Sequence, residues 1–261
     1  MASPVIAARN ASPALAMRAN GAKKASLASS IAEVSRPASS ELRGDACSGL
    51  SEERLAALEK IEHTMNFPAS AIIFMEGQPA HGVYLVRQGR VKLLTTNSEG
   101  RTLILKIAIP GDVLGLNSVI TGKPHDVTAE NLQPAELAFI PRADFLDFIT
   151  QHGDACLHFA SLVSRDCRAA YEVARSIGLC QSVTKRMAKF LLDLASNGAA
   201  GQSATRVTLA LTHEEIAQLI GASRETVTRT LSELKKQRTI ELDGAMLILT
   251  NKTALESLVA A

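Results

Sequence analysis

The sequence predicts an α+β chain in three parts: an antiparallel β-roll, one long helix, and a small helical domain that ends in a β-hairpin. Three observations carry this prediction. Residues 71–140 contain short apolar runs separated by glycine and proline, which is typical of a small antiparallel barrel or jelly roll. Residues 156–177 repeat apolar side chains at alternating spacings of four and three, the period of a helix. Residues 212–238 have the pattern of two short helices separated by a glycine.

Composition sets the bounds of each part. Residues 1–48 are rich in alanine and serine and show little periodicity, so we expect a disordered extension. We place the roll at 49–152, the long helix at 153–180 and the last domain at 181–261. The net charge of +2 over 261 residues favours no class of partner by itself.

The pair of helices carries clear boundary signals. Thr212 and Glu215 have the spacing of a capping box, which begins the first helix. Gly221 ends it, because glycine enters the left-handed cap conformation at little cost. Ser223 is a favourable N-cap for the second helix. Asp243–Gly244 then predicts a tight hairpin, so the domain has the pattern of a winged helix-turn-helix.

The second helix separates an apolar face from a polar one. Val227, Leu231 and Leu234 recur at helical spacing and should face inward. The polar residues left at its start are Arg224, Glu225, Thr228 and Arg229. Helices that enter the major groove read bases with such N-terminal residues: Arg can bond guanine, Glu can accept from the amine of cytosine, and Thr can touch a thymine methyl.

Three further residues complete the candidate DNA-binding set: Thr212, Ser223 and Lys235. Basic residues outnumber acidic ones between 222 and 238, which suits contacts with phosphate. The alternative is a surface helix pair with an ordinary solvated, charged face.

Two sets of motifs resemble the Crp/Fnr family, the regulators related to the cyclic-AMP receptor protein. S-R-E-T-V-x-R, from Ser223 to Arg229, resembles the family's recognition helix. F-x-x-G-x-x-A-x-x-x-Y-x-V-x-x-G-x-V, from Phe74, and P-G-D-x-x-G, from Pro110, resemble its cyclic-nucleotide-binding roll. The resemblance implies a bacterial, cytoplasmic, homodimeric transcription regulator that binds double-stranded DNA at palindromic TGTGA-like half-sites, contacts RNA polymerase, and is no enzyme.

The long helix resembles the dimerisation helix of that family. The small apolar residues of its repeat would form the dimer seam: Cys156, Ala160, Val163, Cys167, Ala170, Ala174 and Ile177. The alternative is a helix packed only on its own roll, which has the same period.

The candidate effector pocket departs from the pattern of the cyclic-AMP binders. Those relatives carry G-E-L where this chain has Gly115-Leu116-Asn117, and Arg-Ser where it has His125-Asp126. Asp126 puts a carboxylate where the cyclic phosphate would lie, and like charges repel strongly in a partly dry pocket. Tyr171 replaces a residue that contacts adenine in those relatives. The sequence therefore predicts that cyclic AMP does not bind.

No cofactor is predicted. The oxygen-sensing relatives need closely spaced N-terminal cysteines, whereas Cys47 stands alone in that region. No cysteine pair has the spacing of a zinc site. Haem sensing through His81, His125 or His158, and thiol-based redox sensing at Cys156 and Cys167, stay as alternatives.

Two other function classes compete. The roll could serve an enzyme or a transport accessory as a ligand module, but the sequence has no nucleophile elbow, P-loop or metal motif. A sensor that acts through protein contacts alone would not need the intact reading residues. No apolar run reaches the length of a membrane span, so no membrane partner is expected.

Overall fold

The computed structural model describes residues 49–179, 182–196, 206–244 and 246–260. The predicted extension at 1–48, Cys47 and Cys180 lie outside these ranges. The first part of the described chain is an antiparallel roll of two four-stranded sheets, with strand orders β1-β8-β3-β6 and β2-β7-β4-β5. The strands are β1 (His63–Phe67), β2 (Ile72–Phe74), β3 (Gly82–Gln88), β4 (Val91–Thr96), β5 (Thr102–Ala108), β6 (Val113–Leu114), β7 (Thr128–Asn131) and β8 (Ala135–Pro141).

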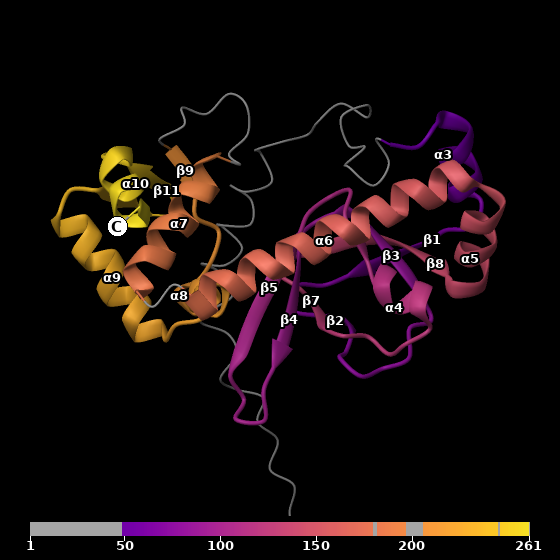
Figure 1. Cartoon of the computed structure of the whole chain (residues 1–261), viewed down its shortest axis with the longest axis horizontal. Coiled ribbons are helices and arrows are strands. Elements are labelled where there is room, and N and C mark those ends of the chain that lie inside the picture. The colour runs from indigo at the N-terminus through magenta and orange to yellow at the C-terminus, as the bar shows by residue number, and fades with distance from the viewer. Residues whose placement is uncertain (1–48, 180–181, 197–205, 245, 261) are drawn as a thin grey trace, which may run out of the picture. The chain divides into compact units, whose positions relative to one another are not determined.

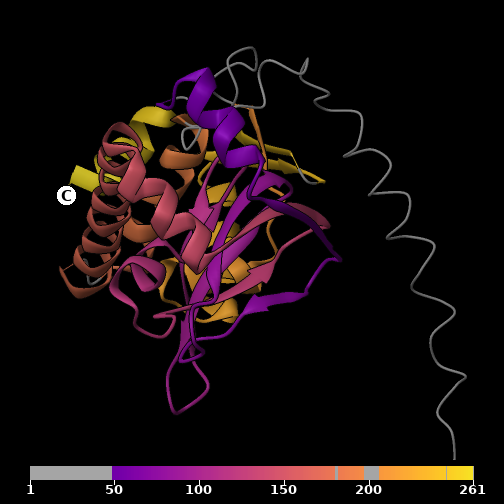
Figure 2. The same ribbon diagram turned by 90° about the vertical axis from the view of Figure 1, so that its right-hand side faces the viewer.

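Glycine at one turn lets the two sheets meet closely. Gly89 lies between β3 and β4 with φ +93°. A Cβ at this position would come within 2.6 Å of the Ala135 Cβ and 2.7 Å of the Pro134 carbonyl oxygen, so only glycine fits. The chain can therefore pass from one sheet to the other here. From β4 it continues into the β4–β5 hairpin, which extends beyond the other strands in both Figure 1 and Figure 2.

Helices cover the outer face of the β1-β8-β3-β6 sheet. They are α3 (Glu52–Glu59), α4 (Leu116–Thr121), α5 (Arg142–Gln151) and the first turns of α6 (Gly153–Leu179). Their apolar side chains form one core with Val83, Leu85 and Ile140 of the sheet. Phe145 of α5 and Phe159 of α6 meet edge to face at 5.0 Å between ring centroids. In Figure 1 these helices gather at one end of the roll.

The two sheets enclose a second core between them. Phe74, Val86, Val91 and Leu137 are buried there, with Tyr84 partly buried beside them. Alternation of side chains along β3 explains both cores, because successive residues of a strand point to opposite faces. Val83 and Leu85 thus face the helices, whereas Tyr84 and Val86 face the roll interior.

The last part is a winged helix-turn-helix domain. Helices α7 (Val183–Ser196), α8 (His213–Ile220), α9 (Arg224–Lys236) and α10 (Lys252–Ala260) pack with the sheet β10-β11-β9. Its strands are β9 (Arg206–Thr208), β10 (Ile240–Asp243) and β11 (Met246–Leu249). Asp243 pairs with Met246, and Gly244 follows Asp243 with φ +57°, so the predicted hairpin is confirmed.

A charged network joins β5 to α6. The Asp112 carboxylate, 7% exposed, accepts hydrogen bonds from Lys106 Nζ at 3.0 Å and Arg165 Nη2 at 3.1 Å. Its second oxygen accepts from the backbone N–H of Ile109 at 3.0 Å. Lys106 Nζ also donates to Asp166 at 2.8 Å. Asp112, the aspartate of the P-G-D motif, therefore holds the long helix against the roll.

We expect Asp112→Asn to lower the free energy of unfolding by about 2 kcal/mol, since it removes the buried carboxylate that pairs with both Lys106 and Arg165. The value lies between the cost of breaking a buried pair and that of an exposed one. Urea unfolding would measure it. Glu99→Gln, in an exposed pair with Arg101, is the control and should cost less than about 0.5 kcal/mol. Equal losses in the two variants would contradict a special role for Asp112.

Candidate nucleic-acid interface and effector site

Local hydrogen bonds fix the start of α8 and the turn between α8 and α9. The Thr212 hydroxyl accepts from the Glu215 N–H at 3.2 Å, and the Glu215 carboxylate accepts from the Thr212 N–H at 2.8 Å. This is the predicted capping box, and it is confirmed. Gly221 ends α8 in the left-handed conformation, with φ +63°. Ser223 caps α9 by accepting from the Thr226 N–H at 3.2 Å.

A side chain from α7 fixes the turn between α8 and α9 through two further hydrogen bonds. Arg186 Nε donates to the Ile220 carbonyl at 2.7 Å, and its Nη2 donates to the Gly221 carbonyl at 3.1 Å. The last carbonyls of a helix have no partner within the helix, and a guanidinium satisfies two of them at once. Sequence reasoning missed Arg186, because a contact across 34 residues leaves no local signal.

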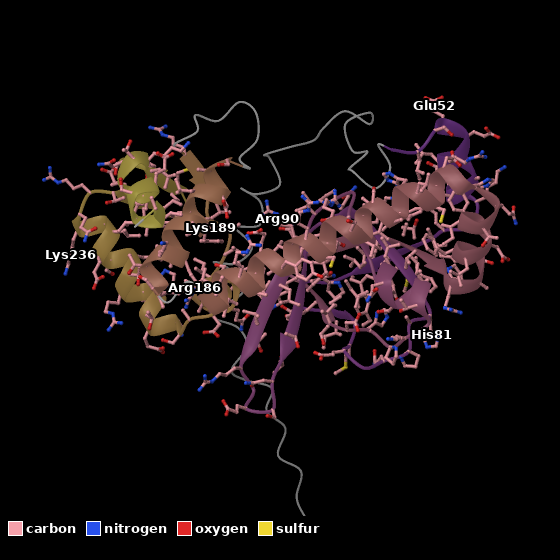
Figure 3. All side chains as sticks on the ribbon, in the orientation of Figure 1. Glu52, His81, Arg90, Arg186, Lys189 and Lys236 are labelled. Atoms are coloured by element: carbon pink, nitrogen blue, oxygen red, sulfur yellow. The ribbon has the colours of Figure 1, made fainter. Side chains whose placement is uncertain are left out.

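Helix α9 presents its polar residues outward as predicted. Val227, Leu231 and Leu234 are at most 2% exposed. The exposed residues of its reading face are Arg224, Glu225, Thr228 and Arg229. Lys235 is exposed near the C-terminal end of the helix, beside Lys236, which projects from the domain in Figure 3. The buried apolar residues and the predicted reading residues thus occupy opposite faces of one helix.

Glu225 is held as a carboxylate. A hydrogen bond from its own backbone N–H lowers its pKa, and the Ser223 hydroxyl and the Arg224 charge act in the same direction. Glu225 therefore stays an acceptor at neutral pH, which is the form that can receive a hydrogen bond from the amine of cytosine.

One contact of the reading helix was missing from the sequence prediction. His213, at the start of α8, lies with its Nδ1 2.9 Å from the Thr228 hydroxyl oxygen. That hydroxyl also donates to the Arg224 carbonyl at 3.0 Å. The two helices of the motif are thus joined by side chains at the face that carries Arg224 and Glu225.

The predicted effector residues of the roll lie around a stacked pair of rings. His125 is 4% exposed, and its imidazole stacks on Phe74 with 3.8 Å between ring centroids and 12° between planes. The same ring covers Gly115, where an added Cβ would lie 3.2 Å from His125 Cε1. Leu116 is 3% exposed. Gly115 and His125 are therefore brought into one packed cluster, whereas the Leu116 side chain belongs to the core between the sheet and the helices.

Asp126 and Tyr171 lie outside that cluster. Asp126 accepts a hydrogen bond from Asn117 Nδ2 at 2.6 Å, next to the turn into α4. Tyr171, 66% exposed, lies on α6, and a hydrogen bond with Cys167 raises its pKa. Within one chain Tyr171 lines a surface hollow with Cys167 and does not join the roll residues.

The exposed face of α6 is rotated from the predicted seam. Cys156, Ala160, Cys167, Ala170 and Ala174 are exposed, as a free seam requires. Val163 packs on the core of the roll instead, and Ile177 is half-buried. The uncharged exposed stripe is Leu157, Ala160, Ser164, Cys167, Tyr171, Ala174 and Gly178. Because Phe159 and Leu162 turn toward the roll, the free face centres on Leu157 and Tyr171.

Comparison with known proteins agrees with this architecture. Residues 64–152 match the model of the cyclic nucleotide-binding domain, and residues 185–258 match that of the Crp-like helix-turn-helix domain. A CRP-like cAMP-activated global transcriptional regulator of Mycobacterium tuberculosis is 30% identical over 79% of this chain and 92% of its own length. This chain belongs to the Crp/Fnr family of transcription regulators.

Two further members of the family are similar to this chain. The cAMP-activated global regulator CRP of Salmonella typhimurium is 27% identical over 71% of this chain and 89% of its own length. The structure of FixK2 from Bradyrhizobium japonicum superposes with a TM-score of 0.68 at 26% identity, over 77% of this chain and 98% of that one. The Crp/Fnr chain described here is thus a DNA-binding regulator and not an enzyme.

Two general features of the described residues bear on other classes. No group of three or more His, Cys, Asp or Glu side chains among them could hold a metal ion. None of the helices traced in those residues is both long and apolar enough to cross a membrane.

The burial of His125 predicts a pH dependence of stability. Burial lowers the pKa of His125 from 6.5, and His81 acts in the same direction while Asp126 opposes it. At pH values well above 6.5 the His125 imidazole is neutral in both the folded and the unfolded chain, so this residue causes no loss of stability there. As the pH falls below 6.5, the unfolded chain takes up the proton first, so the free energy of unfolding decreases until the folded-state pKa is reached.

Thermal unfolding between pH 7.5 and pH 5 would measure this decrease, compared between the wild type and His125→Gln. We expect a shallower decrease in the variant. His63→Gln, at an exposed position of β1, is the control and should keep the wild-type slope. Equal slopes in the wild type and His125→Gln would contradict the assignment. Figure 3 labels His81, the other histidine that affects this group.

Proposed function

We propose that this chain acts as a homodimer that reads palindromic TGTGA-like sites in DNA without cyclic AMP, and that it contacts RNA polymerase when bound. The observation that carries the proposal is the reading face of α9. Arg224 and Arg229 supply donors for guanine, and Glu225 supplies a charged acceptor for cytosine. Their order matches the family motif on which the half-site is proposed.

Homodimerisation is supported by the exposed stripe of α6. Leu157 is 75% exposed and Tyr171 66% exposed, large values for apolar and aromatic side chains. Small residues on the same stripe, such as Ala160 and Ala174, would let two helices approach closely. A two-fold dimer places two recognition helices about one turn of DNA apart, which is what a palindromic site requires.

Independence of cyclic AMP is supported by the packing of the roll. The Mycobacterium tuberculosis and Salmonella typhimurium relatives are named for activation by cyclic AMP. In this chain the His125 ring covers Gly115, and the Asp126 carboxylate, bonded to Asn117, is near enough for its charge to act on His125. An anionic ligand would have to displace a stacked ring and approach a like charge, and both steps cost free energy. The residues present do not fit a cyclic phosphate.

The first experiment is fluorescence anisotropy of the full chain on a labelled TGTGA palindrome and on a scrambled duplex, at one stated salt concentration. The proposal expects selective binding that cyclic AMP leaves unchanged. Selectivity that appears only with cyclic AMP would overturn the interpretation of His125 and Asp126. Equal affinity for both duplexes would overturn the proposed half-site.

Arg229→Ala tests base reading in the same assay. We expect a loss of about 1–3 kcal/mol on the palindrome, with discrimination relaxed at one base position. Lys236→Ala, at the exposed end of α9, is the control. It removes a charge far from the start of the helix, so it should weaken all duplexes about equally. The same uniform loss for Arg229→Ala would mean that Arg229 contacts only phosphate.

Ala160→Glu tests the dimer. A carboxylate on the exposed stripe would face its own copy across the two-fold axis, so we expect a shift to monomer in sedimentation equilibrium. Ala169→Glu adds the same charge at another exposed alanine of α6, off the stripe, and should leave the dimer intact. Dissociation by Ala169→Glu, or a dimeric Ala160→Glu, would place the interface elsewhere.

A further inference from the structure

The Thr228 hydroxyl is occupied by partners within the protein. It lies 3.0 Å from the Arg224 carbonyl oxygen and 2.9 Å from His213 Nδ1. A carbonyl oxygen only accepts, so the single hydroxyl hydrogen of Thr228 goes to Arg224. His213 must then donate to the hydroxyl oxygen, which means that its Nδ1 carries a hydrogen.

These two bonds decide what Thr228 can offer to DNA. With its hydrogen used, the hydroxyl cannot donate to a phosphate oxygen or to the acceptors of guanine or thymine. The hydroxyl oxygen keeps one lone pair as an acceptor, and the methyl group of this exposed side chain is free to pack on a base edge. A methyl group in the major groove finds its complement in the C5-methyl of thymine.

His213 also fixes where that methyl points. In a helix the threonine side chain divides between two rotamers, because its oxygen bonds back to the preceding turn. A donor from a neighbouring helix at the same oxygen favours the one rotamer that meets both partners. Thr228 lies one turn after Arg224 and three residues after Glu225, so its methyl belongs to the same reading face.

We propose that His213 and Thr228 form a specificity-determining pair: His213, on α8, positions Thr228, and the Thr228 methyl selects thymine at one place in each half-site. This rests on the proposed function, since it requires sequence-selective DNA binding. His213 acts here through Thr228 and is a positioning residue.

Deoxyuridine, which is thymidine without the C5-methyl, tests the contact directly. The full chain would first select its site from a random duplex pool, so that the test does not depend on TGTGA. Each thymine of the selected half-site is then replaced in turn by deoxyuridine. We expect one replacement to weaken wild-type binding by about fourfold per half-site, the effect of losing one buried carbon of about 0.8 kcal/mol.

Four variants separate positioning from a merely structural role. Thr228→Ser keeps the hydroxyl and its partners but lacks the methyl, and Thr228→Ala lacks both, so both should lose the sensitivity to deoxyuridine at that position. His213→Ala removes the donor and should reduce the sensitivity at least by half. His213→Asn carries an amide donor near the place of Nδ1 and should restore it. Circular dichroism would confirm that each variant is folded.

The outcomes are distinct. A site-selective wild type with no deoxyuridine effect, or with an effect that Thr228→Ser leaves intact, would overturn the methyl contact. Equal sensitivity to deoxyuridine in His213→Ala and the wild type would overturn the positioning role. If no site is recovered from the pool, the proposed function fails and this inference fails with it.

Discussion

Burial of one face of α9 is the constraint on which the proposed DNA-reading surface depends. Val227, Leu231 and Leu234 are nearly inaccessible, so the rotation of the helix about its own axis is fixed by the core of its domain. The opposite face then has to present Arg224, Glu225 and their neighbours. Hydrophobic burial, which is not directional, thus determines the direction of charged groups whose function requires a defined geometry.

The turn before α9 fixes the position of the helix, in addition to its rotation. Capping by Ser223, the left-handed Gly221 and the guanidinium of Arg186 satisfy the backbone groups left over where α8 ends and α9 begins. The link between His213 and Thr228 adds a side-chain tie across the two helices. A recognition helix that is held both at its N-terminal turn and on its exposed face loses little conformational freedom when it binds, which favours specificity.

Aromatic packing surrounds two of the candidate effector residues of the roll, Gly115 and His125. His125 stacks on Phe74 and lies over Gly115, and Tyr84 lies near Phe74 at 5.7 Å between ring centroids. Aromatic side chains of the chain itself thus pack over Gly115. On the outer side of the roll, the network of Asp112, Lys106 and Arg165 holds α6, which leaves its stripe from Leu157 to Gly178 exposed. One face of this helix thereby packs on the core of the roll, and the other stays exposed as the face on which the proposed dimer would form.

The sequence by itself determined the features that depend on neighbours along the chain. These include the capping box at Thr212, the turn at Gly221, the strands of the roll, the hairpin after Asp243 and the division of α9 into two faces, because caps, turns and periodicity act within a few residues. Only the tertiary structure decided that Arg186 supports the turn, that His213 holds Thr228, that His125 stacks on Phe74, and that α6 exposes Leu157 and Tyr171 while Val163 turns inward. These contacts join segments far apart in sequence, so no local pattern predicts them. A heptad repeat, for its part, does not indicate which side of the helix packs on the core of the same chain.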